Sequence, residues 1–137
     1  NTLFDLIKSG NPNKDYNDFC DINKENEKRR AIAKFYINLM KLNILKSDDL
    51  ITIIDNIINK IINNLSKNDS VDIINELVEL LSIFIVDGID IFKTNCNWQN
   101  IVDHILSMKS KKPKEYEGYS MKTLFKYMDM HDAIKNI

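Results

Sequence analysis

The side chains best suited to catalysis or metal binding are few in this 137-residue sequence and stand far apart. They are two cysteines and two histidines, at Cys20, Cys96, His104 and His131. Zinc sites usually take their ligands from close pairs such as Cys-x-x-Cys, and none of these four residues belongs to such a pair. The sequence also lacks glycine-rich phosphate loops, the HExxH helix and the GxSxG turn. We therefore expect no catalytic residue, no metal and no cofactor.

Charge offers a different chemistry, because the net charge of −1 conceals two basic segments. Residues 24–46 hold seven Lys or Arg against two Glu, and residues 104–126 hold six against two. If both segments lie on one edge of the fold, they can neutralise RNA phosphates, and Tyr116 and Tyr119 offer rings on which unpaired bases stack. The alternative is an ordinary solvated surface. The candidate RNA-binding residues are Lys28, Arg29, Arg30, Lys109, Lys111, Lys112 and Lys114.

The middle of the chain has the opposite charge. Residues 47–103 hold ten Asp or Glu against three Lys. This segment could face a basic protein partner, although a soluble helix also needs a polar face of this kind. The pair Asp48 and Asp49 is explained by the start of a helix, where the helix dipole favours negative charge.

Apolar residues recur every three or four positions through most of the chain, a spacing that predicts five main helices. The expected helices cover roughly residues 25–45, 48–65, 70–84, 97–108 and 120–134. Ser47 and Ser70 are suited to cap the second and third of these, and the fifth begins at Ser120. Gly88 is expected to end the third helix. Residues 3–7 are expected to form the end of a further helix, before the break at residues 9–13.

Individual side chains in these helices carry expectations of their own. Trp98 precedes Ile101 and Ile105 at helical spacing, which favours packing in the core over an exposed anchor for a partner. We expect the methionines near the end, Met121, Met128 and Met130, to fill gaps in that core. His104 is expected to lie on the surface of its helix.

Composition limits the fold class. With 44% hydrophobic residues, three Gly and two Pro, the chain is neither a disordered tail nor a turn-rich β-sandwich. It contains no run of 18 apolar residues and no signal pattern, so we expect a cytoplasmic protein without a membrane partner.

Alternate helices start near residues 29, 70 and 120, a recurrence of about 40 to 50 residues that matches HEAT or armadillo hairpin repeats, although an ordinary bundle of five helices fits as well. We expect one all-α domain over residues 1–137 that is the C-terminal part of a longer array.

The first long helix contains a more specific pattern. Residues 34–45, KFYINLMKLNIL, resemble the signature K-F-φ-G-E-L-φ-K-L-x-φ-L, where φ is apolar, of the middle domain of eukaryotic translation initiation factor 4 gamma. Arg29 and Arg30 are similar to the basic run that opens that helix in the family. Residues 50–81 and 124–131 resemble the family's later helices. Ile37 and Asn38 stand where the family has Gly and Glu. The resemblance implies a HEAT-type α-solenoid built from the later repeats of that domain.

The resemblance also implies a function. Middle domains of this family are non-enzymatic scaffolds of translation initiation that hold the two lobes of a DEAD-box RNA helicase, contact RNA, and meet other initiation factors through regions outside this chain. Turns between helices are the expected contacts with the helicase. The candidate partner-binding residues are Lys46, Asp48, Asp87, Asp90, Phe92, Tyr116 and Tyr119. Alternatives are a related middle domain of mRNA splicing, decay or cap binding, a generic helical interaction module, and an RNA-binding protein without a helicase.

Overall fold

The computed structural model describes residues 16–137, and all of its regular structure over that range is helical. The described helices are α2 (Tyr16–Lys41), α3 (Ser47–Asn64), α4 (Val71–Phe92), α5 (Trp98–Lys109) and α6 (Met121–Lys135), with a short 3-10 helix, η1 (Pro113–Glu115), before α6. The prediction of an all-α fold with five main helices is confirmed for this part of the chain. The helix end expected at residues 3–7 lies outside the described residues.

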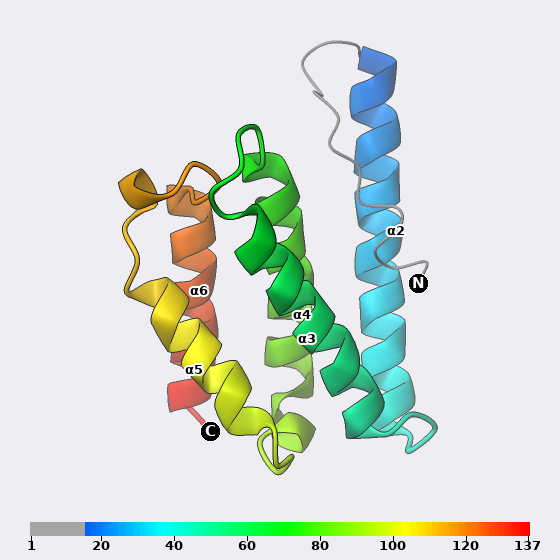
Figure 1. Ribbon diagram of the computed structural model, residues 1–137. Helices are drawn as coiled ribbons and strands as arrows, with labels where there is room; N and C mark the ends of the chain where they lie inside the picture. The colour runs from blue at the N-terminus through cyan, green and yellow to red at the C-terminus, as the bar shows by residue number, and fades with distance from the viewer. Residues whose placement is uncertain (1–15) are drawn as a thin grey trace.

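Helix α4 forms the centre of the molecule. It packs against α2 on one side, against α6 on the other and against α3, whereas α5 packs mainly on α6 and α2 touches α3 only lightly. Figure 1 shows the resulting arrangement, in which α4 lies between α2 and α6 while α3 and α5 lie in front of this row. Ten residues of α4 are buried, among them Leu77, Leu81 and Phe84, because neighbours cover this helix on three sides. Its mostly apolar sequence matches that position.

Helix α2 ends earlier than the apolar spacing predicts. Asn43 adopts a left-handed conformation, with φ of 61°, and its amide donates to the carbonyl of Met40. The amide of Ile44 donates to the carbonyl of Leu39 at 2.9 Å, which completes a Schellman turn. The helix therefore stops at Lys41 instead of Leu45. It also begins at Tyr16 instead of near residue 25. The apolar spacing missed these first turns because they are polar and carry little apolar periodicity.

The predicted end of the third helix at Gly88 is wrong. Helix α4 continues to Phe92, and Gly88 has no positive φ. A Cβ atom at Gly88 would lie 2.4 Å from the ring of Phe92 and 3.0 Å from Cδ1 of Ile37. The glycine is therefore explained by the room it leaves for the ring of Phe92 on the same helix and for Ile37 of α2, and not by the end of a helix.

The three serine positions at the helix starts behave differently. Ser120 caps α6 as its place in the sequence suggests, because its Oγ accepts from the amide of Thr123 at 3.3 Å. Ser70 occupies the N-cap position of α4, but its hydroxyl donates to the carbonyl of Asn64 at 2.7 Å. Ser47 is already helical, and Lys46 takes the N-cap position of α3, where its amide donates to Asp49.

The core contains some of the expected side chains and excludes others. Trp98 is partly buried and packs against the core, as expected, and Met130 is fully buried. Met121 and Met128 are exposed on α6, so the expectation that they fill the core is wrong. Among the described residues, no helix is both long and apolar enough to cross a membrane.

Candidate protein-binding and RNA-binding surfaces

The first basic segment loses two of its three candidate RNA-binding residues to structural contacts. Arg29 is 1% exposed, with its guanidinium held by Asn26 of the same helix. Arg30 forms a bidentate ion pair with Glu76 of α4. Its Nε donates to Oε1 at 3.1 Å and its Nη2 donates to Oε2 at 2.6 Å. Only Lys28 remains exposed. The interpretation of Arg29 as a phosphate ligand is therefore corrected, because the guanidinium group is not accessible.

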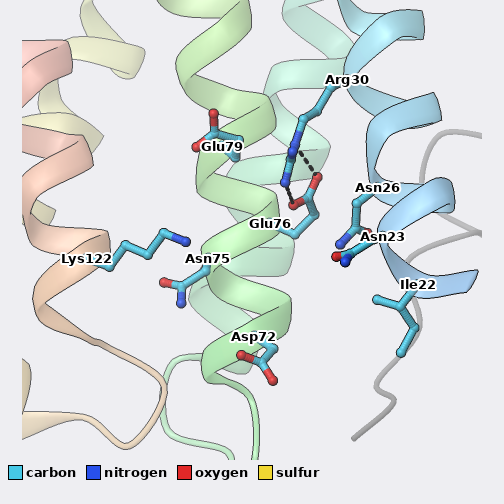
Figure 2. Close-up of a pocket in the computed structure, with 9 residues that line it drawn as sticks. All are labelled: Ile22, Asn23, Asn26, Arg30, Asp72, Asn75, Glu76, Glu79 and Lys122. Carbon is cyan, nitrogen blue, oxygen red and sulfur yellow. Dashed lines mark hydrogen bonds and ion pairs between the residues drawn. The ribbon is translucent and has the colours of Figure 1, made fainter. Parts of the chain in front are cut away.

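The Arg30–Glu76 ion pair lies in a polar pocket between α2, α4 and the start of α6, which Figure 2 shows. The pocket has a volume of about 290 Å³. Its acidic side chains come from α4, and its basic ones come from α2 and α6. The lining residues are Ile22, Asn23, Asn26, Arg30, Asp72, Asn75, Glu76, Glu79 and Lys122. Three carboxylates face two cations here, so the site does not favour an anionic ligand.

Burial and pairing act in opposite directions on Glu76. Burial raises the pKa of Glu76 above its ordinary value, and the hydrogen bonds from Arg30 only partly offset this effect. The same hydrogen bonds raise the pKa of Arg30. The pair joins α2 to α4, and Lys126 of α6 forms a second ion pair with Glu79 at 3.0 Å. Glu76 and Glu79 of α4 thus connect this helix to α2 and to α6.

The second basic segment keeps its charges at the surface. Lys112 and Lys114 are exposed in and beside η1, and the ammonium of Lys111 lies 5.4 Å from the centre of the Tyr116 ring. Lys109 is half-buried, with Nζ 2.8 Å from Nδ1 of His131. This loop therefore presents cations next to an aromatic ring, as the sequence suggested.

Tyr119 does not belong to this surface. The residue is 2% exposed, and its hydroxyl donates to the carbonyl of Met108. Burial raises the pKa of Tyr119 to about 12. Gly118 precedes it, and the Gly118 amide donates to the carbonyl of Leu65 at 2.9 Å. Tyr119 thus anchors the loop, and its interpretation as a stacking or partner-binding residue is corrected.

A groove of about 320 Å³ runs beside this loop, between the end of α3 and helix α5. One cation and no carboxylate line it. The lining residues are Ile62, Leu65, Ser66, His104, Ser107, Met108, Lys111 and Tyr116. Apolar walls, a flat ring and an ammonium in one groove are suited to a planar ligand that carries negative charge.

His104 is more buried than a residue on the surface of a helix. Its Nε2 lies 2.8 Å from the hydroxyl of Tyr127, and the two rings meet edge to face. Tyr127 is fully buried, so this contact joins α5 to α6 through a polar bond in the core. Burial, assisted by the charge of Lys111, lowers the pKa of His104 to about 4. The imidazole is therefore neutral at pH 7 and is held in one position.

The two basic segments do not share an edge. Helix α2, with Lys28, is at one end of the helix row, whereas η1, with Lys112 and Lys114, lies beyond α6 at the other end (Figure 1). The prediction of one continuous basic edge is wrong, because α4 and α6 separate the two segments.

The candidate partner-binding residues also fall into separate groups. Lys46, Asp48, Asp87 and Asp90 are exposed, in the α2–α3 connection, the start of α3 and the last two turns of α4. Asn95, in the α4–α5 turn, donates to Ser47 at 3.0 Å and to Asp48 at 2.7 Å, which ties the two turns together. We refer to this end of the molecule as the acidic end.

Two other partner candidates lie elsewhere. Tyr116 is half-buried in the groove beside η1, at the opposite end from the acidic end (Figure 1). Phe92 is fully buried under Gly88 and is unavailable to a partner, so this expectation is corrected.

The sequence did not point to Glu76 or His104 as partners of Arg30 and Tyr127, because each contact joins residues more than twenty positions apart. Among the described residues, no group of three or more His, Cys, Asp or Glu is placed to hold a metal ion. Comparisons with protein-family models, with curated proteins and with solved structures gave no match to this chain. The residues and their placement therefore carry the functional proposal.

Proposed function

We propose that this protein is a non-enzymatic scaffold of translation initiation that binds and activates a DEAD-box RNA helicase and contacts RNA. The main support is the arrangement of α2, α4 and α6 in one row with α3 and α5 in front, in which α2 packs on α4 and α4 packs on α6. HEAT-type solenoids stack their hairpins in this manner. The resemblance of residues 34–45 to the middle domain of initiation factor 4 gamma supports the same assignment.

The proposed mechanism is conformational. A helicase of this class alternates between separated and closed lobes, and a rigid scaffold that prefers one arrangement increases its population by its differential affinity. The acidic end supplies such a rigid contact, because Asn95 ties the α2–α3 connection to the α4–α5 turn. Asp87 and Asp90 extend this end as exposed negative charges on α4. Its expected counterpart is a basic patch on one helicase lobe.

RNA contact is proposed at the loop that contains η1. Lys111 and Tyr116 line a groove without a carboxylate, and the exposed Lys112 and Lys114 lie beside it. This combination favours single-stranded RNA, which offers phosphates to the lysines and a base to the groove. Lys28 belongs to α2, which forms the far end of the helix row, and is not part of this proposal.

A binding and ATPase assay with a purified initiation-type DEAD-box helicase tests the scaffold function. We expect this chain to bind the helicase at micromolar concentration and to increase its RNA-stimulated ATPase rate only weakly, whereas the complete middle domain should increase it strongly. The double variant Asp87→Lys and Asp90→Lys should weaken binding by about tenfold, because two exposed acidic contacts are reversed. The matched control, Asp129→Lys and Asp132→Lys on α6, should bind as the unaltered protein does.

Failure to bind this helicase at such concentrations would contradict the assignment to initiation. Helicases of splicing, decay and cap-binding complexes, tested in parallel, distinguish the related middle-domain functions. If none of them binds, the generic interaction module becomes the better description.

A further inference from the structure

The outer face of α2 carries an exposed apolar stripe that the functions above do not use. Leu42, Ile44 and Phe35 are 69%, 64% and 58% exposed, which makes them the three most exposed large apolar side chains of the described residues. Leu39, half-buried, lies between them in sequence. Scattered exposed apolar residues are normal on protein surfaces, but three of this size within ten positions form a patch that indicates an interaction site. We refer to Phe35, Leu39, Leu42 and Ile44 as the α2 stripe.

Helical geometry places the stripe opposite the core. The fully buried residues of this part of α2 are Ala33, Ile37 and Met40, which face α4 and the rest of the core. Phe35 and Leu42 are seven residues apart, about two turns or 10 Å, and therefore lie on one line along the helix. At about 100° per residue, both point roughly 160–180° away from Ala33. The stripe thus faces outward at the end of the helix row that α2 forms (Figure 1).

The end of the stripe is rigid. Asn43 and Ile44 form the Schellman turn described above, and the amides of Ile44 and Leu45 both donate to the carbonyl of Leu39. In this motif the residue after the left-handed position packs over the last helical turn. The turn therefore holds Ile44 at the end of the stripe, so a partner would bind it at a small entropic cost.

The charged residues in the segment of sequence that contains the stripe all have one sign. Lys34, Lys41 and Lys46 are exposed, and no acidic residue occurs from position 28 to position 47. Asp48 and Asp49, the nearest acidic residues in sequence, lie in the first turn of α3. Glu76, which pairs with Arg30 of α2, lies on α4. At about 100° per residue, Lys34 and Lys41 lie on one line beside the stripe. An apolar line beside a row of lysines is complementary to an apolar line beside a row of carboxylates.

We propose that the α2 stripe binds an acidic amphipathic helix of a protein partner. The partner helix would insert apolar side chains at helical spacing between Phe35, Leu39 and Leu42, and its Asp or Glu residues would pair with Lys34 and Lys41. The stripe spans the last two turns of α2 and the turn that follows it, a length that matches the apolar face of one partner helix. It is too narrow for stable membrane anchoring, which requires a broader apolar face. This surface is separate from the η1 loop and adjoins the acidic end at the α2–α3 connection.

The probe is a synthetic peptide of about 18 residues, with Leu at helical spacing and Glu at the flanking positions, whose binding is measured by fluorescence anisotropy. A scrambled peptide of the same composition and a Lys-flanked version are the reference ligands. We expect a dissociation constant on the order of 10–100 μM for the acidic peptide. The double variant Phe35→Ser and Leu42→Ser should weaken binding about tenfold or more. Circular dichroism should stay unchanged, because both side chains are exposed.

The chain offers a matched control. Met121 and Phe125 are 52% and 54% exposed on α6, four residues apart, and their neighbours Lys122 and Asp129 carry both signs of charge. Met121→Ser with Phe125→Ser should leave the affinity within about twofold. Lys34→Gln with Lys41→Gln should weaken binding about threefold and reduce its dependence on salt.

Four results would overturn the proposal. The first is an absence of peptide binding up to about 1 mM. The second is an equal loss of affinity in the α6 variant or equal binding of the Lys-flanked peptide. The third is preferential, Phe35-dependent binding to vesicles of phosphatidylcholine with about 30% phosphatidylserine, which would assign the stripe to a membrane. The fourth is a concentration-dependent dimer that Phe35→Ser with Leu42→Ser abolishes, which would assign it to a second copy.

Discussion

The Arg30–Glu76 ion pair allows a quantitative test of how α2 is held to α4. The Glu76 side chain is only 7% exposed, whereas that of Arg30 is 39% exposed and reaches it with two hydrogen bonds. Substituting Arg30→Met keeps an unbranched apolar stem in place of the arginine methylenes and removes the cation. A buried carboxylate without its partner costs about 3–5 kcal/mol when the pair is fully enclosed, and an exposed pair contributes less than about 1 kcal/mol. Because Arg30 is partly exposed, we expect a loss of about 2 kcal/mol in the free energy of unfolding at pH 7.

The loss should depend on pH in a defined direction. The pKa of Glu76 already lies above its ordinary value because of burial, and removing Arg30 raises it further. A carboxyl group with a raised pKa in the folded state contributes most to stability below its unfolded pKa, and this contribution is lost as the pH rises through the folded pKa. The Arg30→Met variant should therefore be less destabilised at pH 5 than at pH 7.5. Urea unfolding followed by circular dichroism at both pH values measures the difference.

Two further variants make the test specific. Arg30→Met combined with Glu76→Leu replaces the pair by apolar side chains and should recover most of the lost stability, because no charge remains buried. Lys126→Met removes the other ion pair of this row, in which both side chains are about one-third exposed, and should cost less than about 1 kcal/mol. The reasoning would be refuted if Arg30→Met cost no more than Lys126→Met, or if the double variant were as unstable as the single one.

Three further predictions concern the loop, the core histidine and RNA. Gly118→Ala should destabilise the fold by about 1–3 kcal/mol in urea unfolding, because the new Cβ would lie 2.4 Å from Oγ of Ser70 and 3.0 Å from the carbonyl of Asn64. His104 has a pKa of about 4 against an unfolded value of 6.5, so its contribution is complete above pH 6.5 and is lost toward pH 4. The difference between the two pKa values corresponds to a change of at most about 3 kcal/mol in the free energy of unfolding. We expect His104→Gln to remove much of the difference between the unfolding free energies at pH 7 and pH 4.5. The double variant Lys112→Gln and Lys114→Gln should weaken the binding of single-stranded RNA and reduce its dependence on salt. The control, Lys28→Gln with Lys34→Gln, should change neither. Unchanged affinity in the first double variant would remove the η1 loop from the RNA proposal.

Local pattern was sufficient for the helices. Apolar spacing predicted all five described helices, because a helix that buries one face must repeat its apolar residues every three or four positions. The boundaries were less accurate where a residue has two uses. Gly88 is typical of a helix end but allows close packing here. Asn43 ends α2 in a left-handed conformation, and the apolar spacing, which continues to Leu45, does not predict this end. The start of α2 was missed because polar turns carry no periodicity.

The candidate sites depended far more on contacts between helices. A sequence read in order identifies Arg29, Tyr119 and Phe92 as charged or aromatic residues near expected turns, but it does not say which side of a helix each one faces once its neighbours are in place. All three are buried. The same holds for the two basic segments, which any linear count treats alike and which the fold separates to opposite ends of the row.

Residue types and their spacing thus sufficed for the all-helical class and for the number of helices over residues 16–137, because these properties depend on neighbours within one or two turns. The location of charge along the chain is likewise given by the sequence. Burial, ion pairing and the grouping of surfaces required the assembled helices. Arg30 meets Glu76 across 46 positions, and His104 meets Tyr127 across 23. Such contacts are set by how α4 packs between α2 and α6, and packing is a property of complementary side-chain shapes that no local pattern contains.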